Sequence, residues 1–147
     1  MNPYEKGSHA YKKAAVNTQD QGTLILMMYD GLVRFLKAGL LKMEARDLEG
    51  THNNLVRAKD IVAELMASLN LEGSGEMGAN LKALYGYMYN RLIDANVQKN
   101  PKMVEEVLSL VSELREGWRG VIDQRKKAGA TPYAQTKGAI KPLNVEG

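Results

Sequence analysis

TLILMMYDGLVRFLKAGLL, residues 23–41, is the stretch that decides the fold of this 147-residue chain. Its apolar side chains recur every three or four positions, the spacing that places them on one face of an α-helix. That face carries Ile25, Met28, Tyr29, Leu32, Leu36 and Met43, with Phe35 at its edge. Leu26, Val33 and Leu40 widen the face on one side, and Met27 and Leu41 lie further round. A helix with this much apolar surface needs either a crowded core or a partner to cover it.

Three further segments show the same helical spacing, and no run shows the alternation that is typical of a β-strand. With the first helix predicted over 22–46, the others are predicted over 51–70, 76–98 and 101–129. The last has the clearest start, because Asn100 can cap a helix whose first residue is Pro101. Residues 47–50 are predicted to form a turn, and the glycines of residues 71–75 to end the second helix.

Four helices of this length joined by short connections predict an all-α fold, an antiparallel up-down four-helix bundle. We expect the bundle to occupy residues 21–128. Residues 1–20 are polar with little periodicity, which predicts an extended N-terminal arm. Residues 129–147 contain Pro132 and Pro142 and predict a flexible C-terminal tail.

The composition is that of a globular protein, with 44% hydrophobic and 25% charged residues. No cysteine is present, which excludes disulfides and thiolate metal sites and favours a reducing compartment. The N-terminal residues lack the apolar core of a signal peptide, so we expect a cytoplasmic protein. The net charge of +3 is weak, and much of the excess comes from Lys126, Lys127, Lys137 and Lys141. This distribution favours a solvated tail over a nucleic-acid surface.

Two short motifs resemble chemical sites without the context that such sites need. Residues 73–78 match G-x-G-x-x-G, but they follow a predicted helix and not the strand of a dinucleotide-binding unit. Glu49 and His52 match the Glu-x-x-His pair of di-iron bundles, but Gly50 interrupts the pair and no second copy exists. With no catalytic set visible, we expect no enzyme activity, no cofactor and no metal.

Four segments, taken together, resemble the FliS family of flagellin-specific secretion chaperones. They are LILMMYDGLVRFL at 24–36, NLVRAKDIVAEL at 54–65, SLNL followed by GEMGANLKALY at 68–85, and ELREGW at 113–118. The resemblance covers residues 4–125 in order. Ser74, Met77, Gly39 and Gly117 depart from the usual family pattern, which could alter the local shape of a groove.

The resemblance implies a chaperone that binds the disordered C-terminal segment of flagellin. It would block premature polymerisation and assist delivery to the flagellar type III export apparatus. The resemblance further implies that the client wraps around the bundle, partly as helices in surface grooves, and that the arm covers part of that surface when no client is present. Two alternatives remain: a metal-binding or enzymatic bundle using Glu49 and His52, and a basic nucleic-acid-binding or adaptor bundle using the tail lysines.

We expect the flagellin groove to include Ile25, Leu26, Tyr29 and Val33, and the arm to cover it with Tyr4 and Tyr11. Leu26 and Val33 are favoured because they lie at the edge of the main apolar face. Core packing is the alternative for Ile25 and Tyr29.

Overall fold

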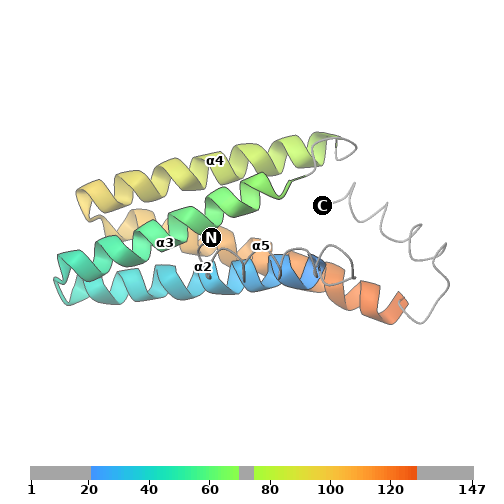
Figure 1. Ribbon diagram of the computed structural model, residues 1–147, viewed down its shortest axis with the longest axis horizontal. Helices are drawn as coiled ribbons and strands as arrows, with labels where there is room; N and C mark the ends of the chain where they lie inside the picture. The colour runs from blue at the N-terminus through green and yellow to red at the C-terminus, as the bar shows by residue number, and fades with distance from the viewer. Residues whose placement is uncertain (1–20, 70–74, 129–147) are drawn as a thin grey trace, which may run out of the picture.

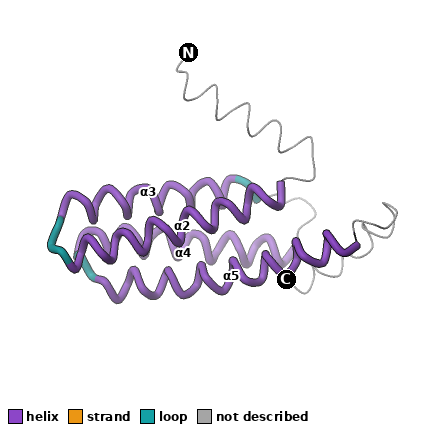
Figure 2. Tube along the Cα trace, turned by 90° about the horizontal axis from the view of Figure 1, so that it is seen from below, coloured by secondary structure: helices purple, strands orange, loops and turns teal. Residues whose placement is uncertain are grey.

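The computed structural model describes residues 21–69 and 75–128, which form four helices. These are α2 (Gln21–Glu44), α3 (Leu48–Ala67), α4 (Gly75–Gln98) and α5 (Pro101–Ala128). Each helix runs antiparallel to the one before it, and α5 returns to pack beside α2 (Figure 1). Figure 2 shows the same arrangement from below, with α5 continuing past the ends of its neighbours. The predicted antiparallel four-helix bundle is therefore confirmed.

The order of the helices around the bundle fixes which surfaces can act independently. Helix α2 packs against α3 and α5, and α4 also packs against α3 and α5. The seam between α2 and α5 consequently lies on the opposite side of the bundle from the seam between α3 and α4. Among the described residues, no helix combines the length and apolar character that crossing a membrane requires.

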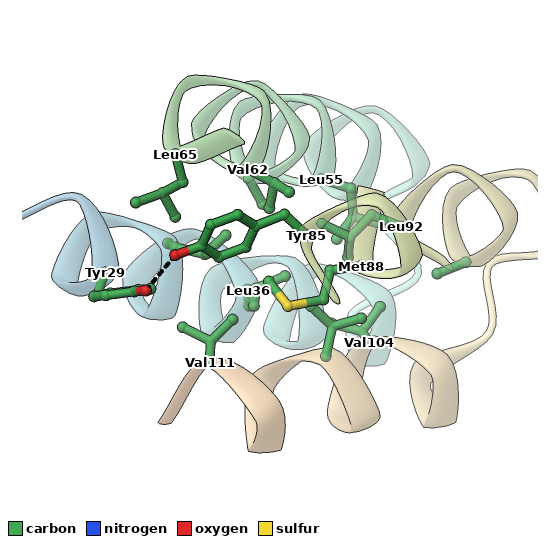
Figure 3. Packing of buried hydrophobic residues seen from close by; sticks show 14 residues of the cluster. Tyr29, Leu36, Leu55, Val62, Leu65, Tyr85, Met88, Leu92, Val104 and Val111 are labelled. Atoms are coloured by element: carbon green, nitrogen blue, oxygen red, sulfur yellow. Dashed lines mark hydrogen bonds between the residues drawn. The ribbon is translucent and has the colours of Figure 1, made fainter. Parts of the chain in front are cut away.

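The core draws side chains from all four helices (Figure 3). Its fully buried members share the three-to-four spacing predicted from the sequence. They include Leu32, Leu36, Leu55, Val62, Leu65, Met88, Leu92, Val104, Val107 and Val111. Because each helix buries only one face, the apolar residues that lie outside these positions remain available at the surface.

Helices α2 and α3 approach closely at two buried glycines of α2. A Cβ atom at Gly39 would lie 3.0 Å from Cδ2 of Leu55, and one at Gly31 would lie 3.4 Å from Cδ1 of Ile61. Absence of a side chain at these positions thus lets α3 pack against the backbone of α2.

The α2–α3 connection is shorter than predicted, because Asp47 is a helix cap and not part of a four-residue turn. The Asp47 side chain accepts a hydrogen bond from the Gly50 amide, with a donor–acceptor distance of 2.8 Å, and α3 begins at Leu48. Our prediction of a turn over 47–50 was therefore wrong for residues 48–50. Arg46 reverses the chain with φ of 59°, a role more often filled by glycine.

The α4–α5 connection follows the sequence prediction. Pro101 is the first residue of α5, and the Asn100 side chain accepts a hydrogen bond from the Lys102 amide at 3.0 Å. Lys99, between the two helices, adopts the left-handed backbone conformation, with φ of 52°. At the other end of α4, Gly75 has φ of 58° and opens the helix. The rest of the predicted 71–75 turn lies outside the described residues.

Candidate functional site

The α2–α5 seam runs along the N-terminal half of α2. It brings together polar and apolar side chains from both helices. Gly22, Leu26, Asp30 and Val33 recur at helical spacing along the side of α2 that faces α5. On α5 the corresponding residues are Arg115, Trp118, Ile122 and Arg125. We call these eight residues the α2–α5 seam.

Trp118 joins the two helices at the first turn of α2. Its indole Nε1 donates a hydrogen bond to the Gly22 carbonyl oxygen at 2.8 Å. A Cβ atom at Gly22 would lie 3.7 Å from both Trp118 and Ile122, which is ordinary van der Waals contact. Trp118 therefore fixes the start of α2 against α5 while part of its own ring remains exposed.

Arg125 adds a cationic group beside this tryptophan. Its guanidinium carbon lies 5.6 Å from the centroid of the Trp118 ring, within the range of a cation–π interaction. The Arg125 Nε is buried and has no hydrogen-bond partner among the described residues. Buried donors are normally paired. The seam consequently contains one donor whose hydrogen bond is not made within the bundle.

An ion pair holds the seam two turns further along α2. Arg115 donates a hydrogen bond from Nε to the Asp30 carboxylate. This hydrogen bond raises the pKa of Arg115, so its charge is retained at any pH at which the protein is folded. The pair orients α5 relative to α2 on the solvent side of the core.

The four groove residues predicted on the first helix occupy different environments. Leu26 is half-buried on the seam, and Val33 is partly buried and packs against the core. Ile25 is also partly buried against the core. Tyr29 is 4% exposed and lies inside the core, which places its side chain out of reach of a partner in this conformation. Leu26 and Val33 are thus the two predicted residues that lie together on the seam.

Sequence periodicity alone gave no binding role to Trp118 or to Arg125. Trp118 is the single tryptophan of the chain, and an aromatic ring with a polar edge is typical of binding surfaces. The presence of a single tryptophan was therefore the feature of the sequence that could have indicated a binding residue. Nothing in the sequence placed Arg125 beside Trp118 across the first turn of α2. The arm residues Tyr4 and Tyr11, and the tail lysines Lys137 and Lys141, lie outside the described residues.

The histidine of the Glu-x-x-His pair, His52, forms part of a helix–helix contact. His52 Nδ1 and Asn96 Nδ2 are 2.9 Å apart, which joins the second turn of α3 to the last turn of α4. Among residues 21–69 and 75–128, no cluster of three or more His, Cys, Asp or Glu side chains could hold a metal ion.

Comparison with known proteins gives a consistent result. Residues 4–125 match the model of the family described as flagellar protein FliS. The flagellar secretion chaperone FliS of Bacillus subtilis is 36% identical over 86% of this chain and 91% of its own length. The FliS chaperone of Escherichia coli is 34% identical over 78% of this chain and 88% of its own length. That of Salmonella typhimurium is 34% identical over 74% of this chain and 82% of its own length.

Proposed function

This chain belongs to the FliS family of flagellar proteins, and from that premise we propose that it is an export chaperone for flagellin. It binds the C-terminal segment of flagellin, prevents that subunit from polymerising early and assists its delivery to the flagellar export apparatus. The observation that supports this proposal most directly is the α2–α5 seam. There, half-buried Leu26 and Trp118 extend the apolar surface of the bundle beyond its core.

The physics of such binding is that of a helix entering a groove. An amphipathic segment places its apolar face against apolar side chains of the bundle. As the segment folds, its backbone amides and carbonyls form the hydrogen bonds of the new helix. A disordered segment loses conformational entropy when it folds on the bundle, and this loss opposes binding. Useful affinity therefore requires a large contact surface. A client that wraps around the bundle meets that requirement better than one that touches a single turn.

The two ends of the seam suit different parts of such a client. Leu26 and Val33 offer apolar contact along α2. Arg125 offers a buried Nε–H that lacks an acceptor among the described residues. A backbone carbonyl or a carboxylate of the client, at the end of its helix, would satisfy this donor.

We further propose that the N-terminal arm covers the seam in the free chaperone and is displaced by the client. Residues 1–20 join α2 directly at Gln21, beside Trp118. Tyr4 and Tyr11 have the amphipathic character needed to cover apolar surface that would otherwise promote self-association.

Isothermal titration with a flagellin C-terminal peptide tests the main proposal. Coupled folding and apolar burial predict a negative heat-capacity change. Leu26→Asp should weaken binding by about tenfold or more, since it replaces an apolar contact with a charged carboxylate that the client helix would have to desolvate. Leu41→Asp is the matched control, because Leu41 lies on the same helix, is 67% exposed and is outside the seam.

Circular dichroism must show that both variants keep their helical content. If the peptide does not bind at micromolar concentrations, the flagellin proposal is wrong. If Leu26→Asp and Leu41→Asp weaken binding equally, the client binds elsewhere on the bundle. Deleting residues 2–16 tests the arm: we expect tighter client binding or self-association. A monomer with unchanged affinity would exclude occlusion by the arm.

A further inference from the structure

The α2–α5 seam contains two arginines on the same side of α5, and they differ in their partners. Arg115 donates a hydrogen bond to the Asp30 carboxylate, and its Nη1 lies 3.5 Å from Oε1 of Glu116. Arg125 lies about three turns further along α5. Among the described residues, no carboxylate lies within ion-pair distance of Arg125, and its buried Nε has no hydrogen-bond acceptor. Arg125 is therefore the cation of the seam that the described part of the chain leaves without an anion.

The surroundings of Arg125 hold its guanidinium group in place. The guanidinium carbon lies 5.6 Å from the centroid of the Trp118 ring, and Nη1 would lie 3.6 Å from a Cβ atom at Gly22. Gly22 is itself fixed, because its carbonyl oxygen accepts the hydrogen bond from Trp118 Nε1. An arginine packed in this way loses little conformational entropy when it binds a ligand. The planar guanidinium matches the geometry of a carboxylate, so Arg125 is a preorganised donor for that group.

Arg125 also lies at one end of the seam. From Asp30 to Gly22, α2 covers about 12 Å. Helix α2 begins at Gln21, whereas α5 continues past the ends of its neighbours (Figure 2). The surface that the two helices form together therefore ends at Gly22 and Arg125. A helix bound along the seam can end at the same place.

The two ends of a helix present different groups to such a donor. At the C-terminal end the last backbone carbonyls have no partner within the helix, and the helix dipole places about half a unit of negative charge there. A helix at the end of its chain adds the α-carboxylate. The N-terminal end presents N–H groups, which cannot accept a hydrogen bond from Arg125. A helix on the seam should therefore place its C-terminal end at Arg125 and its earlier turns on Leu26 and Val33.

We propose that Arg125 binds the C-terminal carboxylate of the client and thereby fixes the direction in which the client lies on the seam. The client helix runs antiparallel to α2 and parallel to α5, with its last turn beside Trp118. This inference rests on the proposed flagellin function, because the C-terminal segment of flagellin ends in a free carboxylate. It adds a means of recognising the end of the client chain, since an internal segment with the same apolar face lacks that group.

Peptides of the flagellin C-terminal segment provide the main test, with either the natural carboxylate or a carboxamide at the end. Amidation removes the terminal charge and leaves the apolar face unchanged. Isothermal titration into the full chain should show that the amide binds about tenfold more weakly, since hydrogen bonds to charged groups are the stronger ones. A third peptide, extended by Gly-Ser-Gly-Ser, moves the carboxylate away from Arg125 and should bind as weakly as the amide.

The variant Arg125→Gln assigns this effect to one side chain. It should bind the carboxylate and amide peptides with equal affinity, because the cation that distinguishes them is absent. Lys126→Gln is the matched control: it removes the same charge from the next residue, which is exposed, and should keep the preference. Circular dichroism must show that both variants keep their helical content. Because the ratio of the two affinities is compared, a general weakening of the seam in Arg125→Gln does not imitate the expected result.

A nitroxide label on the client measures its direction on the seam. Trp118 is the only tryptophan of the chain, and a nitroxide quenches its fluorescence only at short range. With a peptide that lacks tryptophan, a label in the last turn should quench Trp118 more strongly than a label about three turns earlier, which would lie near Val33. The opposite order would show that the client runs the other way.

The possible contradictions are distinguishable. Equal affinity of the wild type for the carboxylate and amide peptides would overturn this inference and leave the flagellin function intact. Glu5 and Asp20, the carboxylates of the arm, lie outside the described residues, and if either holds Arg125 in the complex the result is this same equality. A preference that persists in Arg125→Gln would place the carboxylate at another cation. Binding of neither peptide would overturn the flagellin function and this inference with it.

Discussion

Tyr29 of α2 and Tyr85 of α4 meet inside the core with their hydroxyl oxygens 2.5 Å apart (Figure 3). The two helices lie diagonally across the bundle, so this hydrogen bond crosses the core between helices that are not neighbours. Burial raises the pKa of both hydroxyls, and both remain protonated at any pH at which the protein functions. Each tyrosine therefore supplies the polar partner that the other needs in an apolar environment.

We predict that the two tyrosines are energetically coupled. Tyr85→Phe leaves the Tyr29 hydroxyl buried without this partner and should lower the free energy of unfolding by about 1–3 kcal/mol. The double variant Tyr29→Phe/Tyr85→Phe should lose less than the sum of the two single variants, because no orphaned hydroxyl remains. Urea denaturation of all four proteins gives the coupling free energy. Strictly additive losses would show that the hydroxyl contact contributes nothing specific.

Asp47 should stabilise the bundle as the cap of α3. Asp47→Ala removes the acceptor of the Gly50 amide and should lower the free energy of unfolding by about 1 kcal/mol. Asp47→Asn keeps a capping oxygen but loses the ion pair with Lys42, where Nζ and Oδ2 are 3.6 Å apart. Because surface ion pairs contribute little, we expect Asp47→Asn to be nearly neutral. Thermal denaturation of both variants, with Asp123→Ala as an exposed control, separates the capping effect from the charge effect.

Two glycines in helix interiors should respond oppositely to alanine. Gly117→Ala places a methyl group in open space and should raise the free energy of unfolding by up to about 1 kcal/mol, from helix propensity. Gly39→Ala gains the same propensity but brings Cβ to 3.0 Å from Cδ2 of Leu55, whose side chain is 1% exposed. Crowding in the core should outweigh the gain and lower the stability. Chemical denaturation of the pair measures the difference, and equal stabilisation would mean that α3 moves aside freely.

The outer contact between α4 and α5 should depend on pH through Glu106. This carboxylate accepts a hydrogen bond from the Tyr87 hydroxyl and another from Arg91 Nε, whose distance to Oε1 is 2.8 Å. Both hydrogen bonds lower the pKa of Glu106, and the one from Tyr87 has the larger effect. A carboxyl whose pKa is lower in the folded state stabilises the protein above its unfolded-state pKa, near 4.3. That contribution is lost as the pH falls through the lower folded-state value.

Comparison of the wild type with Glu106→Gln checks this dependence. The wild type should have the higher melting temperature near pH 7, and the difference should shrink near pH 3. The effect is small, because the groups are exposed. Glu105→Gln changes the neighbouring exposed carboxylate. Its difference in melting temperature from the wild type should not shrink between pH 7 and pH 3. A constant gap between wild type and Glu106→Gln across this pH range would exclude the proposed linkage.

The helices were predictable because their apolar periodicity is local, and Asn100 with Pro101 marks a start that needs no tertiary information. The α2–α3 connection was less predictable, since Arg46 adopts a left-handed conformation that usually selects glycine. An aspartate followed by Leu-Glu-Gly fits a turn as well as a cap. The Asp47 side chain accepts a hydrogen bond from the Gly50 amide, which makes it a cap and starts α3 at Leu48.

The seam could be predicted only in part. Leu26 and Val33 were identifiable from their place at the edge of the apolar face. Trp118 reaches Gly22 across 96 positions of sequence, and such a contact depends on the register between helices. For the same reason, sequence periodicity grouped Tyr29 with the apolar face but could not place its hydroxyl against Tyr85.

Trp118 should report directly on client binding, because it is the only tryptophan in the chain and lies on the α2–α5 seam. A flagellin segment that covers the seam must remove water from the exposed part of the indole. We therefore expect the emission maximum to move to shorter wavelength and acrylamide quenching to decrease as the segment is added. Leu41→Asp should preserve this response, and Leu26→Asp should lose it at the same peptide concentration. Binding heat without any change in Trp118 emission would place the client away from the seam, even if the chaperone function is correct.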